Sequence, residues 1–143
     1  MSKELPRRDE YGWFCPITTR WADNDIYGHV NNVVYYAYFD TVANSFLIEQ
    51  GGLDIHEGDT VGFVVNSQCD YFAPVAFPDR LEGAFRVNRL GNSSVEYGIA
   101  IFREGEEQAV AAGTFTHVFV ERASNQSVRI EGVLRQALES QLS

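Results

Sequence analysis

One long segment of helical periodicity, from Asn31 to Gly51, most constrains the fold of this chain. Apolar residues recur along this segment at steps of three and four residues, which is the spacing of one face of a helix. The apolar positions are Val30, Val33, Val34, Ala37, Tyr38, Val42, Phe46 and Leu47. Polar residues are confined to a narrow stripe of Tyr36, Asp40 and Asn44, and two glycines end the pattern. The segment therefore predicts one long helix that is covered by protein over most of its circumference.

The remainder of the chain is mostly typical of strands, with alternating apolar residues, aromatic residues and threonines. The expected strands are Trp13 to Trp21, Val61 to Phe72, Leu81 to Leu90, Val95 to Phe102 and Val110 to Val120. The segment APVAFPD ends the second of them, and GNSS and REGEEQ lie between the later ones as turns, which predicts antiparallel pairing. A short terminal helix is expected over Glu131 to Leu142.

This order of elements has few packing solutions, because a helix that is apolar on most sides needs a sheet that curls around it. We expect an α+β fold in a single domain over residues 1–143, since 143 residues with 45% hydrophobic content suffice for one ordinary core.

The charge and the hydropathy pattern disfavour several classes of partner. The net charge is −9, whereas binding to nucleic acid or to an anionic membrane surface requires a basic surface. No signal peptide is visible, and no apolar run reaches the roughly 18 to 20 residues of a membrane span. We expect a soluble, cytoplasmic protein that binds neither nucleic acid nor membrane.

Metal and nucleotide motifs are missing from the sequence. Cys15 and Cys69 are too far apart for a CxxC motif, and we expect buried free thiols. His56 and His117 show no metal-ligand spacing with His29 or with the cysteines. Neither a GxGxxG nor a Walker-type pattern occurs. We therefore expect an enzyme without metal or other cofactor.

The segment RWADNDIYGHVNNVVYYAYFDTV, from Arg20 to Val42, carries the chemistry. It sets Asp25 a few residues before a helix N-terminus, whose unpaired backbone N–H groups can hold a negative oxygen. A carboxylate that faces such an anion hole suggests acyl-group hydrolysis. The alternative is that Asp25 only stabilises the loop or caps the helix, because aspartate is common in such turns.

The pattern D-x-x-G-H-V-N-N-x-x-Y-x-x-Y, from Asp25 to Tyr38, resembles the hotdog-fold thioesterases of the 4-hydroxybenzoyl-CoA thioesterase type. The resemblance covers nearly the whole chain, including the DYFAPVAFPD connection and the HVFVERAS ending of the last strand. It implies a hotdog fold, in which a curved antiparallel five-stranded sheet wraps one long central helix. It also implies an acyl-CoA substrate.

The resemblance assigns roles to individual residues. Asp25 matches the catalytic carboxylate of the family, and the backbone N–H of Asn32 matches its oxyanion donor. Tyr35 matches an aromatic residue that shapes the site. His29 and Asn31 fit the loop pattern of a subgroup that acts on fatty acyl-CoA. The remaining residues expected to bind substrate in this loop are Tyr27 and Gly28.

The family is usually dimeric or tetrameric, with active sites at the subunit boundary and coenzyme A contacts partly on the partner. The resemblance therefore implies a homo-oligomer. A basic cluster of some members is replaced around RLGNSS, where Arg89, Asn92 and Ser93 remain as the expected contacts.

Several residues of the loop have simpler interpretations. Asp23 is expected to be a solvated or loop-bonding carboxylate, and Asn31 to cap the helix. His29 is interpreted as shaping the site, and a role as a general acid stays open. Tyr35 and Tyr38 are also consistent with ordinary core aromatic residues.

Thioester hydrolysis needs little machinery, because a thioester carbonyl has weak resonance protection and a thiolate is a tolerable leaving group. An ionised Asp25 could attack the carbonyl to give an anhydride, or could deprotonate an attacking water. The leading hypothesis is an acyl-CoA thioesterase. Two alternatives remain open: an enoyl-CoA hydratase or dehydratase, which would use Asp25 with His29, and a noncatalytic acyl-CoA or acyl-carrier binding module, which would not need the carboxylate.

Overall fold

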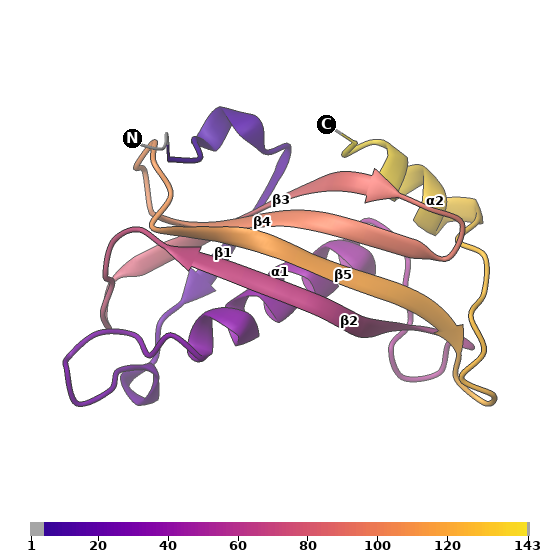
Figure 1. Ribbon diagram of the computed structural model, residues 1–143, viewed down its shortest axis with the longest axis horizontal. Coiled ribbons are helices and arrows are strands. Elements are labelled where there is room, and N and C mark those ends of the chain that lie inside the picture. The colour runs from indigo at the N-terminus through magenta and orange to yellow at the C-terminus, as the bar shows by residue number, and fades with distance from the viewer. Residues whose placement is uncertain (1–4, 143) are drawn as a thin grey trace.

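The computed structural model describes residues 5–142, and a five-stranded sheet lies across one long helix (Figure 1). The strands and helices are β1 (Trp13–Thr18), α1 (Val34–Glu49), β2 (Thr60–Tyr71), β3 (Arg80–Leu90), β4 (Ser94–Arg103), β5 (Ala111–Glu121) and α2 (Gly132–Glu139). Two short 3-10 helices, η1 (Arg8–Glu10) and η2 (Trp21–Asp23), flank β1 in sequence. Within residues 5–142, no helix is both long and apolar enough to cross a membrane.

The sheet has the order β1-β3-β4-β5-β2, and every neighbouring pair is antiparallel. Hairpins join β3 to β4 and β4 to β5, as the turn residues predicted. The connection from β2 to β3 instead crosses the sheet, so that β2 pairs only with β5 and forms one edge. The predicted α+β hotdog architecture is confirmed, and the sheet leaves β1 and β2 as its two edges.

The core lies between α1 and one face of the sheet. Phe39, Val42 and Leu47 of α1 are completely buried. Phe46 stacks on Phe85 of β3 with ring centroids 4.2 Å apart, and Trp13 of β1 contacts Phe46 edge-on at 5.4 Å. Burying aromatic side chains of this size contributes strongly to folding free energy, so α1 is held firmly against the sheet.

Three details differ from the prediction. The strand predicted to reach Trp21 ends at Thr18, because the chain turns there and the Thr19 hydroxyl donates to the Asp79 carbonyl at 2.7 Å. Helix α1 begins at Val34 rather than Asn31. Its exposed face is also wider than the predicted polar stripe, because a single sheet covers only one side of a helix. The exposed residues of α1 are Tyr36, Ala37, Asp40, Thr41, Ile48 and Glu49.

The two cysteines are free thiols, as predicted, but each is only half-buried. Burial raises the pKa of both Cys15 and Cys69 to about 11, so both thiols are protonated at neutral pH. In the described part of the chain, no three His, Cys, Asp or Glu side chains are grouped to hold a metal ion.

His117 on β5 is a buried histidine within the core. It is 1% exposed, and its Nδ1 lies 3.0 Å from the hydroxyl of Tyr97, which is completely buried. Burial lowers the pKa of His117 to about 4 from the ordinary 6.5, because the charged imidazolium would lose its hydration. The folded protein therefore keeps this imidazole neutral over a pH range in which the unfolded chain would protonate it.

This histidine predicts a pH-dependent stability. Between pH 6.5 and pH 4 the unfolded chain binds the additional proton, so the free energy of unfolding falls as the pH falls, by no more than about 1.4 kcal/mol per pH unit. Urea unfolding at several pH values checks this. His117→Gln should flatten the pH dependence, whereas the control His56→Gln, at an exposed position, should keep it. An unchanged slope in His117→Gln would contradict the assignment.

Candidate active site

A pocket of about 480 Å³ opens where the loop after η2, the start of α1 and the segment after β2 meet. Its lining comes from all three segments and combines a carboxylate, a histidine and an asparagine with aromatic and apolar side chains. The lining residues are Asp25, Tyr27, His29, Val30, Asn32, Tyr35, Tyr71, Phe72, Ala73 and Pro74. The pocket therefore places polar groups beside an apolar wall.

A tight turn holds Asp25 at the pocket. Its Oδ1 accepts the Tyr27 N–H at 2.9 Å, its carbonyl accepts the Gly28 N–H at 3.0 Å, and its N–H donates to the His29 carbonyl at 3.0 Å. Gly28 has φ +83°, a conformation that favours glycine. The Oδ2 atom of Asp25 has no hydrogen-bond partner within residues 5–142, so one carboxylate oxygen orients the side chain and the other is available.

The start of α1 leaves one backbone donor unused at the same pocket. The predicted cap at Asn31 is not the N-cap of α1, which is Val33; the Asn31 Oδ1 instead accepts the Val33 N–H at 3.0 Å in the turn before the helix. The Asn31 N–H donates to the Asp23 carbonyl at 2.9 Å, and the Asn31 carbonyl accepts the Val34 N–H at 2.9 Å. The Asn32 N–H between these bonds has no acceptor in the described chain. A helix start with such a donor favours binding of a negative oxygen.

Tyrosines form one wall of the pocket. The Tyr71 hydroxyl donates to the Asn32 carbonyl at 2.9 Å, and the Tyr71 ring meets that of Tyr35 edge-on at 5.1 Å. Burial raises the pKa of Tyr35 to about 12, and burial followed by the nearby Cys69 thiol raises that of Tyr71. Both phenols are therefore neutral at physiological pH, and the wall suits an uncharged acyl group.

Tyr71 and the segment after β2 also line the pocket, and neither was predicted as part of the site. Phe72, Ala73 and Pro74 follow β2, and the Val30 N–H donates to the Val75 carbonyl at 2.8 Å, which ties this segment to the loop. The one available signal was the proline-interrupted segment DYFAPVAFPD, which predicted only a strand end.

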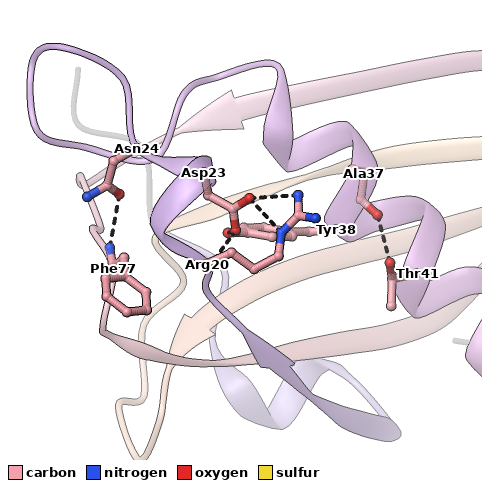
Figure 2. A network of polar contacts seen from close by, with 7 residues as sticks. All are labelled: Arg20, Asp23, Asn24, Ala37, Tyr38, Thr41 and Phe77. Atoms are coloured by element: carbon pink, nitrogen blue, oxygen red, sulfur yellow. Dashed lines mark hydrogen bonds and ion pairs between the residues drawn. The ribbon is translucent and has the colours of Figure 1, made fainter.

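Asp23 lies beneath the loop and is 1% exposed. Its interpretation as a solvated carboxylate was therefore wrong, and its interpretation as a carboxylate that bonds within the loop is confirmed. Its carboxylate accepts hydrogen bonds from Arg20 and from the Tyr38 hydroxyl of α1 (Figure 2). The same view shows Asn24, whose Oδ1 accepts the Phe77 N–H at 3.0 Å, tying the loop to the segment before β3.

The structure brings some of the predicted residues together and leaves others apart. Gly28 and Asn31 shape the loop beside the pocket without lining it. Asn92 and Ser93 lie in the turn between β3 and β4, and Arg89 lies near the end of β3 beside it, at the other end of the sheet. The paired part of β4 from that turn to the pocket end, Ser94 to Ile101, has eight residues, whose seven steps span roughly 24 Å. These three residues therefore do not reach the pocket of their own chain.

Comparison with known proteins gives one family. Residues 27–110 match the model of the thioesterase superfamily. The long-chain acyl-CoA thioesterase FadM of Escherichia coli is 27% identical over 124 residues, which is 86% of this chain and 94% of that protein. The YsmA protein of Bacillus subtilis is 26% identical over 62% of this chain, and the match spans only 59% of its own length.

A solved structure is similar over nearly the whole chain. The PA5185 protein from Pseudomonas aeruginosa strain PAO1 is 61% identical, with a TM-score of 0.96 and 98% of each chain covered. That similarity includes the loop, the start of the helix and the segment after β2 that together form the pocket.

Proposed function

Because this chain belongs to the thioesterase superfamily and is a thioester hydrolase, we propose that its pocket hydrolyses an acyl-coenzyme A to a free carboxylic acid and coenzyme A. One observation carries the proposal. Within residues 5–142, one carboxylate oxygen of Asp25 and the N–H of Asn32 have no hydrogen-bond partner, and both residues line the same pocket. A reacting carboxylate and an oxyanion donor are the two groups that thioester hydrolysis requires.

Asp25 is proposed as the reacting group. In one route a carboxylate oxygen bonds to the acyl carbon, the thiolate leaves, and water hydrolyses the resulting anhydride. In the other route Asp25 takes the proton of a water that attacks the same carbon. Either route places negative charge on the carbonyl oxygen, which the Asn32 N–H at the helix start would hold. His29 is proposed to shape the pocket mouth, since it is exposed there.

The acyl group proposed for this pocket is that of a fatty acyl-CoA. The pocket wall of Tyr35, Tyr71 and Phe72 offers apolar surface, and a relative with 27% identity is a long-chain acyl-CoA thioesterase. Free thiol released from straight-chain acyl-CoAs of increasing length, with an aromatic acyl-CoA beside them, tests this assignment. A preference for the aromatic substrate would overturn the fatty acyl part of the proposal and leave the hydrolytic part standing.

The active unit is proposed to be a homo-oligomer joined at the edge strand β2. This strand pairs with β5 on one side, and no strand of residues 5–142 pairs with the backbone groups on its other side. Phe63 is 62% exposed, Val64 41% and Val65 53%. A long apolar edge favours pairing with another strand, and a second copy would meet that requirement. We assign Arg89, Asn92 and Ser93 to coenzyme A bound at the partner's pocket.

This assembly predicts a defined effect of one edge substitution. Phe63→Lys should shift the mass measured by light scattering from an oligomer to a monomer and remove most of the activity, because a charged edge residue opposes strand pairing. Val133→Lys is the matched control, since Val133 is 63% exposed on α2. It should leave both mass and activity unchanged. A monomeric wild type would contradict the proposed assembly.

A further inference from the structure

We propose that Asp23 is a positioning residue that sets the direction of the Asn32 amide, although it does not line the pocket itself. The inference rests on the function proposed above. It arises from two sets of contacts of this buried residue: its carboxylate bonds Arg20 and Tyr38 of α1 (Figure 2), and its backbone carbonyl accepts the Asn31 N–H.

The Asp23 carboxylate uses both oxygens. Oδ1 accepts hydrogen bonds from Nε and one terminal nitrogen of Arg20 at 3.0 and 2.9 Å. Oδ2 accepts the Arg20 backbone N–H at 2.9 Å and the Tyr38 hydroxyl at 2.8 Å. All four partners are donors, so the site is built for a carboxylate. Arg20 directly precedes η2 and Tyr38 belongs to α1, and Asp23 therefore joins the start of η2 to this helix.

The backbone of Asp23 carries this constraint to the oxyanion donor. Its carbonyl accepts the Asn31 N–H at 2.9 Å, and the Asn31 carbonyl accepts the Val34 N–H at 2.9 Å. The first bond holds the peptide that precedes Asn31, and the second holds the carbonyl of the peptide that joins Asn31 to Asn32. Because the second peptide is planar, the direction of its carbonyl sets that of the Asn32 N–H, and the bond to Asp23 restrains the residue from which this peptide extends.

The electrostatics of the network agree with an ionised Asp23. Burial alone would raise the pKa of this carboxyl, but the hydrogen bonds from Tyr38 and Arg20 outweigh burial and lower it. Burial, together with the bond to Asp23, raises the pKa of Tyr38, so the phenol keeps the proton that it donates. An asparagine at position 23 would place its side-chain NH2 group, which is a hydrogen-bond donor, against the donors of Arg20 and Tyr38. The hydrogen bonds of the network could then not all form.

The test substitutes Asp23→Asn and measures acyl-CoA hydrolysis. The value of kcat should fall about tenfold, because small displacements of a catalytic donor cost rate. KM and the affinity for a non-hydrolysable thioether analogue should change by less than about twofold, because the pocket wall is intact. Tyr38→Phe should lower kcat in the same direction by less. Asp40→Asn is the matched control, because Asp40 is exposed on the same helix and its carboxylate bonds only Asn44 among the described residues.

A second readout is the backbone amide resonance of Asn32 in a ¹⁵N-labelled sample. It should shift in Asp23→Asn and Tyr38→Phe and stay in place in Asp40→Asn. Unchanged kcat and an unmoved Asn32 resonance in the folded variants would overturn the inference. If Asp23→Asn does not fold, Tyr38→Phe decides by the same two readouts. If the wild type hydrolyses no acyl-CoA, the proposed function fails, and the Asn32 resonance alone decides whether Asp23 positions that amide.

Discussion

Asp25→Asn is expected to lower kcat for acyl-CoA hydrolysis by about 10³-fold, within the range that a reacting or proton-accepting carboxylate contributes. An amide neither attacks the thioester carbonyl nor accepts the proton of water. The loop should keep its shape, because an asparagine Oδ1 can still accept the Tyr27 N–H. Thiol release under saturating substrate measures the change, and KM should change much less than kcat.

A matched control is available at the other end of the molecule. Asp54 also forms a turn in which its Oδ1 accepts two backbone N–H groups, those of His56 and Glu57, at 3.0 Å. In Asp54→Asn the turn should therefore keep its shape, as the loop does in Asp25→Asn, and kcat should not fall. Hydrolysis that continues undiminished in Asp25→Asn would remove this carboxylate from the mechanism.

Asn32→Pro is expected to lower kcat by about 10²–10³-fold, the cost of removing one oxyanion donor. Proline deletes the backbone N–H, and it is well tolerated in the first turn of a helix, where that N–H is not needed within the helix. No acceptor for the Asn32 N–H occurs within residues 5–142, so the substitution breaks no bond of the folded chain. Circular dichroism and the thermal midpoint verify that the variant is folded.

The side chain of Asn32 supplies the control. Asn32→Ala keeps the backbone N–H and should retain kcat to within a few-fold, because the proposed donor is the peptide and not the carboxamide. Equal losses in Asn32→Ala and Asn32→Pro would assign the role to the side chain and contradict the backbone donor.

The sequence predicted the elements of the fold well, because each depends on local patterns. The three- and four-residue spacing of Val42 and Phe46 predicted α1, and the turn GNSS predicted the β3–β4 hairpin. The pairing of β2 with β5 could not be derived in that way. It joins residues that are 40 to 61 positions apart in sequence, from Tyr71 with Ala111 to Thr60 with Glu121, and depends on how the sheet closes over the helix.

The same distinction applies to the candidate site. The turn at Asp25 and the bond from the Val33 N–H to Asn31 depend on one short segment, whose pattern already pointed to both residues. The bond from Tyr71 to the Asn32 carbonyl and the burial of Asp23 against Tyr38 depend on packing between distant segments. A strand pattern gives no sign that one of its tyrosines reaches a helix start.

The most direct measurement is thiol release by the wild-type protein with a panel of acyl-CoAs. The account predicts saturable hydrolysis of at least one fatty acyl-CoA well above the spontaneous rate, without added metal or cofactor, and its loss in Asp25→Asn. Tight binding of acyl-CoAs with no release of thiol from any of them would contradict a hydrolytic site and indicate a noncatalytic binding module.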